Sequence, residues 1–258
     1  MTARRPFIIP LLACSLALAV PAQARIPVTV AATDSAQAPF TFADGSGLGR
    51  DLVDALNGVQ SRYAFNYVLM PTLRVTEMVA SGVIDLASLH NIAWGWDARG
   101  VAATMDLCVA RDVFIARKEA TRDESFFDGI GTLPMVGVIG FHYRFAGYSE
   151  DQAALKRAFN LVLVKDELTV IRMILEGRGE IGITASTTLD YLRKVDPELH
   201  GRLLVSRRFD SEYGRHFVVS AKAPIEPAEL DDYLRTLARD GALAAIFERY
   251  GLSAPRIP

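Results

Sequence analysis

The stretch SGVIDLASLHNIAWGWDARGVAATMDLCVARDVFIARK, Ser81 to Lys118, decides the fold of this chain, because it contains two apolar strands separated by a loop. The first strand is expected over Val83 to Leu89, where apolar residues follow a small-residue turn. The second is expected over Leu107 to Arg117, an apolar run with β-branched residues. Two strands that flank a long loop are typical of a rigid scaffold that presents a binding loop.

The loop between the two strands carries two tryptophans and an arginine. Trp94 and Trp96 lie two residues apart, and Arg99 follows three residues after the second tryptophan. Large rings and a guanidinium on a loop offer stacking area together with a positive charge. We therefore interpret this stretch as one wall of a ligand cleft followed by a strand that leaves the domain.

The N-terminal residues 1–24, MTARRPFIIPLLACSLALAVPAQA, have the three parts of a secretory signal peptide. Arg4 and Arg5 are basic, Phe7 to Val20 is apolar, and Ala22-Gln23-Ala24 is a small-x-small cleavage site. The apolar part is too short to span a bilayer. The sequence therefore predicts export with cleavage of this segment.

The chain contains two cysteines, Cys14 in the leader and Cys108 in the mature chain, and the cleavage site decides which of them remain. Leu11 to Cys14 resembles a loose lipoprotein cleavage box, although cleavage before Cys14 would leave an apolar stub on the mature chain. If residues 1–24 are removed, Cys108 is the cysteine that remains, and no internal disulfide can form. Its place in an apolar strand predicts a buried, unreactive thiol.

Length and charge limit the classes of protein that this chain can belong to. Loss of residues 1–24 leaves 234 residues and lowers the net charge from −2 to −4. This length suits one large domain or two lobes of about 100 residues each. The negative charge disfavours a nucleic-acid partner, which would require a basic surface.

Strands and helices alternate along most of the mature chain. The expected strands are Ile26–Ala32, Tyr63–Leu69, Met135–Ile139, Leu161–Val164, Ile181–Thr184, Leu203–Arg207 and Arg215–Ala221. The expected helices are Asp51–Val59, Pro71–Ala80, Ser149–Phe159, Glu167–Glu176 and Thr187–Lys194, with a charged linker at Lys118–Asp128. This alternation predicts an α/β fold with mostly parallel sheets flanked by helices.

Three motifs in this order resemble one protein family. They are VTVAATD…APFTFADGSGLGRDLVDAL at residues 28–56, MILEGRGEIGITASTTLDYL at residues 173–192 and IEPAELDDYLRTLARDGALAAIFERYGL at residues 225–252. Each is loose alone, but their order and spacing are similar to those of the bacterial periplasmic solute-binding proteins of the polar amino acid type, extracellular solute-binding family 3. The resemblance implies a two-lobe fold of type II with two hinge crossings. It places lobe 1 at residues 25–112 and 216–258 and lobe 2 at residues 113–215.

The same resemblance implies ligand contacts in the first lobe. Arg99 lies near the position of the relatives' carboxylate-binding arginine, whose planar fork can make two parallel hydrogen bonds; the other interpretation is a surface loop arginine. One of Trp94 and Trp96 is expected to face the cleft and the other to pack inward. Phe40 corresponds to a cleft aromatic in relatives, although its own sequence context, without the resemblance, favours a core phenylalanine at a strand end. Arg74 is open between a cleft position and a solvated surface.

The second lobe departs from the family pattern at two places. Gly140 to Tyr143 is bulkier than the small turn that relatives use, and Ala185 stands where relatives have an aspartate for the ligand's ammonium group. The candidate contacts in this lobe are Phe141, His142, Thr184 and Ser186. For His142 a surface position beside a helix is the alternative. Without the aspartate, an organic acid, an aromatic solute or a decarboxylated compound is as plausible a ligand as an α-amino acid.

The resemblance implies a binding protein, and the residues offer little for catalysis. We expect a periplasmic monomer without a cofactor that delivers a small polar or anionic solute to an inner-membrane ABC permease. The four histidines lack metal-ligand spacing, and no G-x-S-x-G elbow is present. The alternatives are an enzyme on the same scaffold, similar to the dehydratases of this fold, and a periplasmic sensor or orphan binding protein.

Overall fold

The computed structural model describes residues 24–35, 37–94, 96, 100–149, 151–255 and 257. Two predictions fall outside the described residues: the signal peptide up to residue 23, with its alternative at Cys14, and the placement of Arg99.

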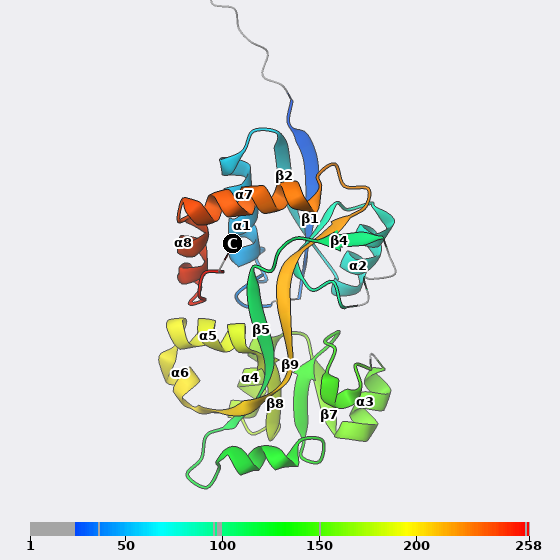
Figure 1. Cartoon of the computed structure of the whole chain (residues 1–258). Coiled ribbons are helices and arrows are strands. Elements are labelled where there is room, and N and C mark those ends of the chain that lie inside the picture. Colours follow the sequence, from blue (N-terminus) through cyan, green and yellow to red (C-terminus); the bar gives the residue numbers. More distant parts are fainter. Residues whose placement is uncertain are drawn as a thin grey trace, which may run out of the picture.

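The described residues form two lobes joined by two long strands (Figure 1). The first lobe contains β1 Ile26–Thr33, α1 Leu48–Val59, β2 Tyr63–Met70, α2 Thr72–Ser81, β3 Leu86–His90, β4 Val101–Ala103, α7 Pro227–Arg239 and α8 Ala242–Arg249. The second contains η2 Glu124–Gly129, β6 Met135–Val138, η3 Arg144–Ala146, α3 Gln152–Phe159, β7 Leu161–Val164, α4 Glu167–Leu175, β8 Ile181–Ala185, α5 Ser186–Val195 and α6 Pro197–Gly201. The joining strands are β5 Cys108–Arg117 and β9 Leu203–Ser220.

The strands follow one hydrogen-bonded path, β2-β1-β3-β9-β5-β8-β6-β7, and β4 also pairs with β9. Within the lobes β1 is parallel to β2 and β3, and β6 is parallel to β7 and β8. The long strands β5 and β9 are antiparallel to each other and pair from Cys108 opposite Arg215 to Arg117 opposite Leu203. The predicted α/β fold with mostly parallel sheets and two crossing strands is therefore confirmed, and β9 joins the two sheets.

The lobe boundaries predicted from the resemblance lie within the two joining strands. The boundary between residues 112 and 113 falls in the middle of β5, and the boundary between residues 215 and 216 falls within β9. Residues near these boundaries belong to a rigid pair of strands rather than to loops.

Each lobe packs apolar residues on both faces of its sheet. In α1 the buried side chains recur at helical spacing, with Leu48, Leu52 and Leu56 fully buried against the first sheet. A second cluster around Trp96 covers the other face under α2. The second lobe has the same arrangement, with α4 and α5 on one face and α3 and η2 on the other.

Two local features differ from the predictions in extent. The strands expected at Leu203–Arg207 and Arg215–Ala221 are parts of one continuous strand, β9 Leu203–Ser220, because pairing with β5 keeps the polar segment between them extended. The expected linker contains the 3₁₀ helix η2, which buries Phe127.

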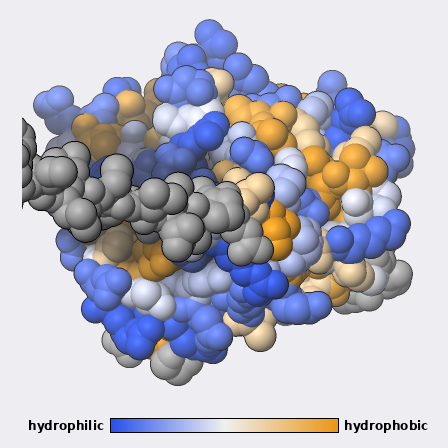
Figure 2. Space-filling model, turned by 90° about the horizontal axis from the view of Figure 1, so that it is seen from above, coloured by the Kyte–Doolittle hydropathy of each residue, from blue (hydrophilic) through white to orange (hydrophobic). Residues whose placement is uncertain are grey.

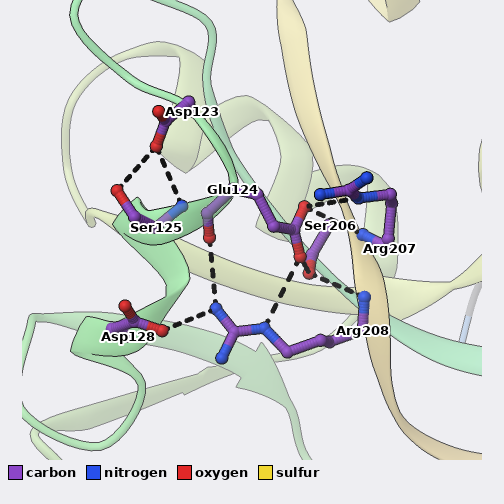
Figure 3. Close-up of polar contacts among 7 residues, drawn as sticks. All are labelled: Asp123, Glu124, Ser125, Asp128, Ser206, Arg207 and Arg208. Atoms are coloured by element: carbon purple, nitrogen blue, oxygen red, sulfur yellow. Dashed lines mark hydrogen bonds and ion pairs between the residues drawn. The ribbon is translucent and has the colours of Figure 1, made fainter.

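A polar network fixes η2 to β9 (Figure 3). The carboxylate of Glu124 accepts hydrogen bonds from the Ser206 hydroxyl at 2.7 Å and from the backbone N–H of Arg207 at 3.1 Å. The Arg208 guanidinium reaches the carboxylate of Asp128 at 2.9 Å. These hydrogen bonds and ion pairs hold the charged segment that contains η2 against β9.

The surface mixes hydrophilic and hydrophobic residues. On the face seen in Figure 2, hydrophobic residues lie interspersed among hydrophilic ones. Among the residues that the structure describes, no helix combines the length and the apolar character needed to cross a membrane.

Candidate functional site

A cavity of about 480 Å³ lies between the two lobes. Its first-lobe wall follows the carboxyl ends of β1 and β3, and its second-lobe wall follows those of β6 and β7. Ligands of parallel α/β sheets bind outside the carboxyl ends of the strands. The described lining residues are Thr33, Asp34, Ser35, Gln37, Pro71, Thr72, Thr76, His90, Trp94, Trp96, Asp112, Ile139, Gly140, Phe141, His142, Gln152, Lys165 and Tyr213.

Aromatic rings form a continuous part of the cavity wall. The rings of Trp94 and Tyr213 meet edge to face with centroids 5.1 Å apart. His90 contacts Trp94 and Trp96 in the same manner, at 5.9 and 5.7 Å. Burial, followed by the charges of Arg215 and His216, lowers the pKa of His90 to about 3. The imidazole of His90 is therefore neutral near pH 7 and acts as one more ring in the wall.

Asp112 places a buried carboxylate in this wall. The residue lies on β5, is 4% exposed, and accepts hydrogen bonds from the hydroxyls of Ser211 at 2.8 Å and Tyr213 at 2.9 Å. Burial raises the pKa of Asp112 to about 6, against the lowering effect of these two hydrogen bonds. At neutral pH the group is therefore mostly charged, although its desolvation is unfavourable.

Arg215 lies on β9 beside the same rings and does not belong to the described lining. Its guanidinium is centred 4.8 Å from the Phe40 ring, 4.9 Å from the Trp94 ring and 5.2 Å from the Tyr213 ring. Its Nη1 donates to the carbonyl of Leu89 at 2.9 Å, while its Nε is buried without a hydrogen-bond partner among the described residues. This arginine supports the aromatic wall through cation–π contacts.

A second buried carboxyl group, that of Glu167, lies at the junction of the lobes. Its Oε1 accepts hydrogen bonds from the backbone N–H of Ala185 at 2.6 Å and from the Thr184 hydroxyl at 3.2 Å. The Thr188 hydroxyl lies 2.7 Å from Glu167 Oε2 and 2.6 Å from the carbonyl oxygen of Ala38 in the first lobe. A hydroxyl donates one hydrogen, so both contacts are hydrogen bonds only if Oε2 carries a proton. Burial raises the pKa of Glu167, which favours that protonated form.

Helix α5 extends this contact between the lobes. The ring of Tyr191 packs 5.4 Å from that of Phe42 and 6.5 Å from that of Tyr250, both in the first lobe. The Lys194 ammonium donates to the backbone carbonyl of Glu248. The structure is therefore one in which the two lobes are in contact along α5.

The structure brings four of the residues expected from the sequence to the cavity. These are Trp94, Trp96, Phe141 and His142. Trp96 is fully buried in the first-lobe core as well as lining the cavity, whereas Trp94 is partly exposed.

The other expected contacts lie elsewhere. Phe40 is buried beneath the guanidinium of Arg215, and Thr184 is buried against Glu167. Ser186 accepts a hydrogen bond from the backbone N–H of Arg111 at 3.0 Å. Arg74 is exposed on α2 and does not belong to the described lining.

Ala185, the position that departs from the family pattern, is fully buried and does not line the cavity. Its backbone N–H is held by Glu167. The specificity expected from a missing aspartate at this position therefore does not apply to the cavity described here.

Reasoning from the sequence missed Asp112, Tyr213 and Arg215. The available signal was chemical: Asp112 is an acid in a mostly apolar strand, and a carboxylate is rarely buried there without a partner. What the sequence alone could not show is that β5 and β9 are adjacent, so that Tyr213 meets Asp112. Among the described residues no group of three or more histidine, cysteine or acidic side chains is arranged to hold a metal ion.

Comparisons of sequence give no relatives for this chain. No protein-family model matches it, and no curated protein matches it significantly.

Comparison of structures gives many matches, at low sequence identity. An ABC uptake transporter substrate-binding protein from Streptococcus pneumoniae with bound histidine is 16% identical with a TM-score of 0.70, covering 89% of this chain and 94% of that one. A putative binding component of an ABC transporter from Wolinella succinogenes, complexed with lysine, is 16% identical with a TM-score of 0.69, covering 89% and 97%. An ancestral amino acid-binding protein described as a precursor of cyclohexadienyl dehydratase is 16% identical with a TM-score of 0.64, covering 87% and 95%. These matches confirm the resemblance at the level of the fold: the chain has the two-lobe fold of the solute-binding proteins.

Proposed function

We propose that this protein binds a small amino-acid-like solute between its lobes and delivers it to an ABC permease of the inner membrane, as a monomer in the periplasm. The observation that carries the proposal is the cavity itself, which is lined by both lobes and by both joining strands. A cavity divided in this way is completed when the lobes meet and is exposed when they separate, as capture and release require. Two structural neighbours are described with bound lysine and bound histidine, which supports a solute of this size.

The positions of the tryptophans provide a direct test. The sequence contains two tryptophans, and both line the cavity. We expect a solute from a panel of amino acids, amines and organic acids to change the intrinsic tryptophan fluorescence saturably. The same solute at 100 times its Kd should stabilise the protein by about 2.7 kcal/mol.

The matched control for this titration is Trp94→Phe. It retains a ring in the wall but should remove a large part of the fluorescence change while binding persists by calorimetry. Absence of any response across the panel, in both fluorescence and melting temperature, would argue against solute binding.

A second function is favoured by one observation. A carboxyl group with a pKa of about 6 in a cavity wall suits general acid–base chemistry, so Asp112 could serve an enzyme on this scaffold. Incubation of the bound compound followed by NMR distinguishes the two functions. A binding protein returns its solute unchanged, whereas an enzyme converts it and loses that conversion in Asp112→Asn.

A further inference from the structure

Asp112 brings a negative charge to the cavity wall from a buried position. Its carboxylate is almost completely buried, and its hydrogen-bond donors are the neutral hydroxyls of Ser211 and Tyr213. It makes no ion pair with any of the described residues. A buried charge without an opposite charge is unfavourable, so such a group is stabilised when a cation binds beside it.

Two described basic residues near the cavity, Arg215 and Lys165, do not pair with Asp112. Arg215 is held by the Leu89 carbonyl and covers the rings of Phe40 and Trp94, outside the described cavity wall. Lys165 lines the cavity from the second lobe, but its side chain is 84% exposed and lies 4.0 Å from Asp166. Arg215 is close enough to lower the pKa of Asp112 but forms no ion pair with it, so the negative charge of Asp112 in the cavity wall is only partly compensated.

The rings around Asp112 suit a cation better than an anion. Tyr213 donates its hydroxyl to the carboxylate and packs edge to face against Trp94, which in turn contacts His90. The faces of aromatic rings attract positive charge, and the neutral His90 adds no opposing charge. Arg215 already covers one face of the Trp94 and Tyr213 rings, so the carboxylate of Asp112 is the group that would attract a protonated nitrogen.

We infer, resting on the proposed function, that the solute carries a protonated nitrogen that binds Asp112, while its carbon body lies against the rings of Trp94 and Tyr213. The ligand class is a primary amine or an amino acid. A solute whose charged groups are all carboxylates should bind more weakly, because it would meet the negative charge of Asp112. Asp112 on the joining strand is the residue that selects for the cation.

The test uses compounds matched in size. Cadaverine, lysine and glutarate share a short chain, and phenethylamine, phenylalanine and phenylacetate share a phenyl ring, but the net charge changes from positive to negative within each set. In calorimetric titrations of the wild-type protein, an amine or amino acid of at least one set should bind, and its matched acid should bind at least tenfold more weakly.

Variants identify the residue responsible. Asp112→Asn should weaken binding of the cation by about 10- to 100-fold, the loss expected for one charge-assisted hydrogen bond. Asp34→Asn is the matched control, because Asp34 lines the same cavity but is exposed to water. We expect less than about threefold loss in that variant, since exposed pairs contribute little.

The pH dependence of the wild-type protein gives a measurement that needs no variant. Affinity for the cation should fall as pH decreases through about 6, because protonated Asp112 no longer attracts it. The groups that influence Asp112 are Glu167 from α4 and Tyr213 and Arg215 from β9, and His90 and His142 share the cavity. The decrease should therefore be absent in Asp112→Asn, in which the other groups remain.

The possible outcomes separate the inference from the function on which it rests. If the acids bind as tightly as the matched amines, or Asp112→Asn leaves the affinity unchanged, the inference is overturned while solute binding stands. If no compound of any charge binds, the proposed function fails together with the inference.

Discussion

Two buried carboxyl groups, Asp112 and Glu167, lie at the junction of the lobes, and they are compensated in different ways. Both have pKa values raised by burial. Asp112 receives two hydroxyl donors and lines the cavity, whereas Glu167 receives a backbone N–H and two hydroxyl groups and lies outside the described lining. Desolvation alone therefore does not decide what a buried acid does. Asp112 faces a cavity, where a ligand can satisfy it, whereas Glu167 is enclosed by hydrogen bonds and burial favours its protonated form.

The largest effect on stability should come from removing the carboxyl group of Glu167. Glu167→Ala should lower the free energy of unfolding by about 3 kcal/mol, because the Ala185 N–H and two threonine hydroxyls lose their partner and a cavity forms. Glu167→Gln is the decisive companion. A neutral amide can accept from Ala185 and donate to Thr188, so its cost should remain below about 1 kcal/mol. Equal losses in urea denaturation of the two variants would show that Glu167 is charged.

The next effect has the opposite sign and concerns Asp112. The pKa of Asp112 is about 6 in the folded protein and about 3.9 in an unfolded chain, so the folded state favours the protonated carboxyl group. This contribution to stability is therefore fully present below pH 4 and is lost as pH rises through 6. Asp112→Asn should therefore raise the stability of the ligand-free protein at pH 7 by about 2 kcal/mol. The wild-type decline in stability between pH 4 and pH 6 should also become shallower in this variant. A variant that is less stable than the wild type at pH 7 would contradict the view that this charge is poorly compensated.

The smallest expected effect concerns the hydroxyl between the lobes. Thr188→Val should lower stability by about 1 kcal/mol, because the Ala38 carbonyl and Glu167 both lose a hydrogen-bond partner. Thr188→Ser keeps the hydroxyl and should retain most of the stability in the same denaturation assay. A loss in the serine variant as large as in the valine variant would assign the effect to packing of the methyl group.

Local patterns in the sequence were sufficient for most of the fold. Strands with buried apolar runs and helices with one apolar face could be located to within a few residues, as at β8 and α5. The spacing of apolar residues that identifies such an element lies within the element's own sequence. The continuity of β9 could not be predicted, since its polar middle segment is extended only because β5 lies beside it.

The candidate site was harder to predict than the fold. Trp94 and Phe141 were expected at a ligand cavity and line the one described here, because they follow the ends of strands. Asp112, Tyr213 and Arg215 were not expected, because their roles arise from the pairing of two strands about a hundred residues apart in sequence. Charge compensation depends on neighbours in space, which periodicity does not report.

The position of Cys108 has a consequence for studying motion. This cysteine is partly buried at the start of β5, opposite Arg215, and burial raises the pKa of its thiol to about 12. At neutral pH such a thiol is almost entirely protonated, so it should react slowly with oxidants and alkylating reagents. Once the predicted leader is removed, no other cysteine competes for a labelling reagent. The rate at which Cys108 is alkylated should therefore report changes in the exposure of the start of β5, where the joining strands meet the first lobe.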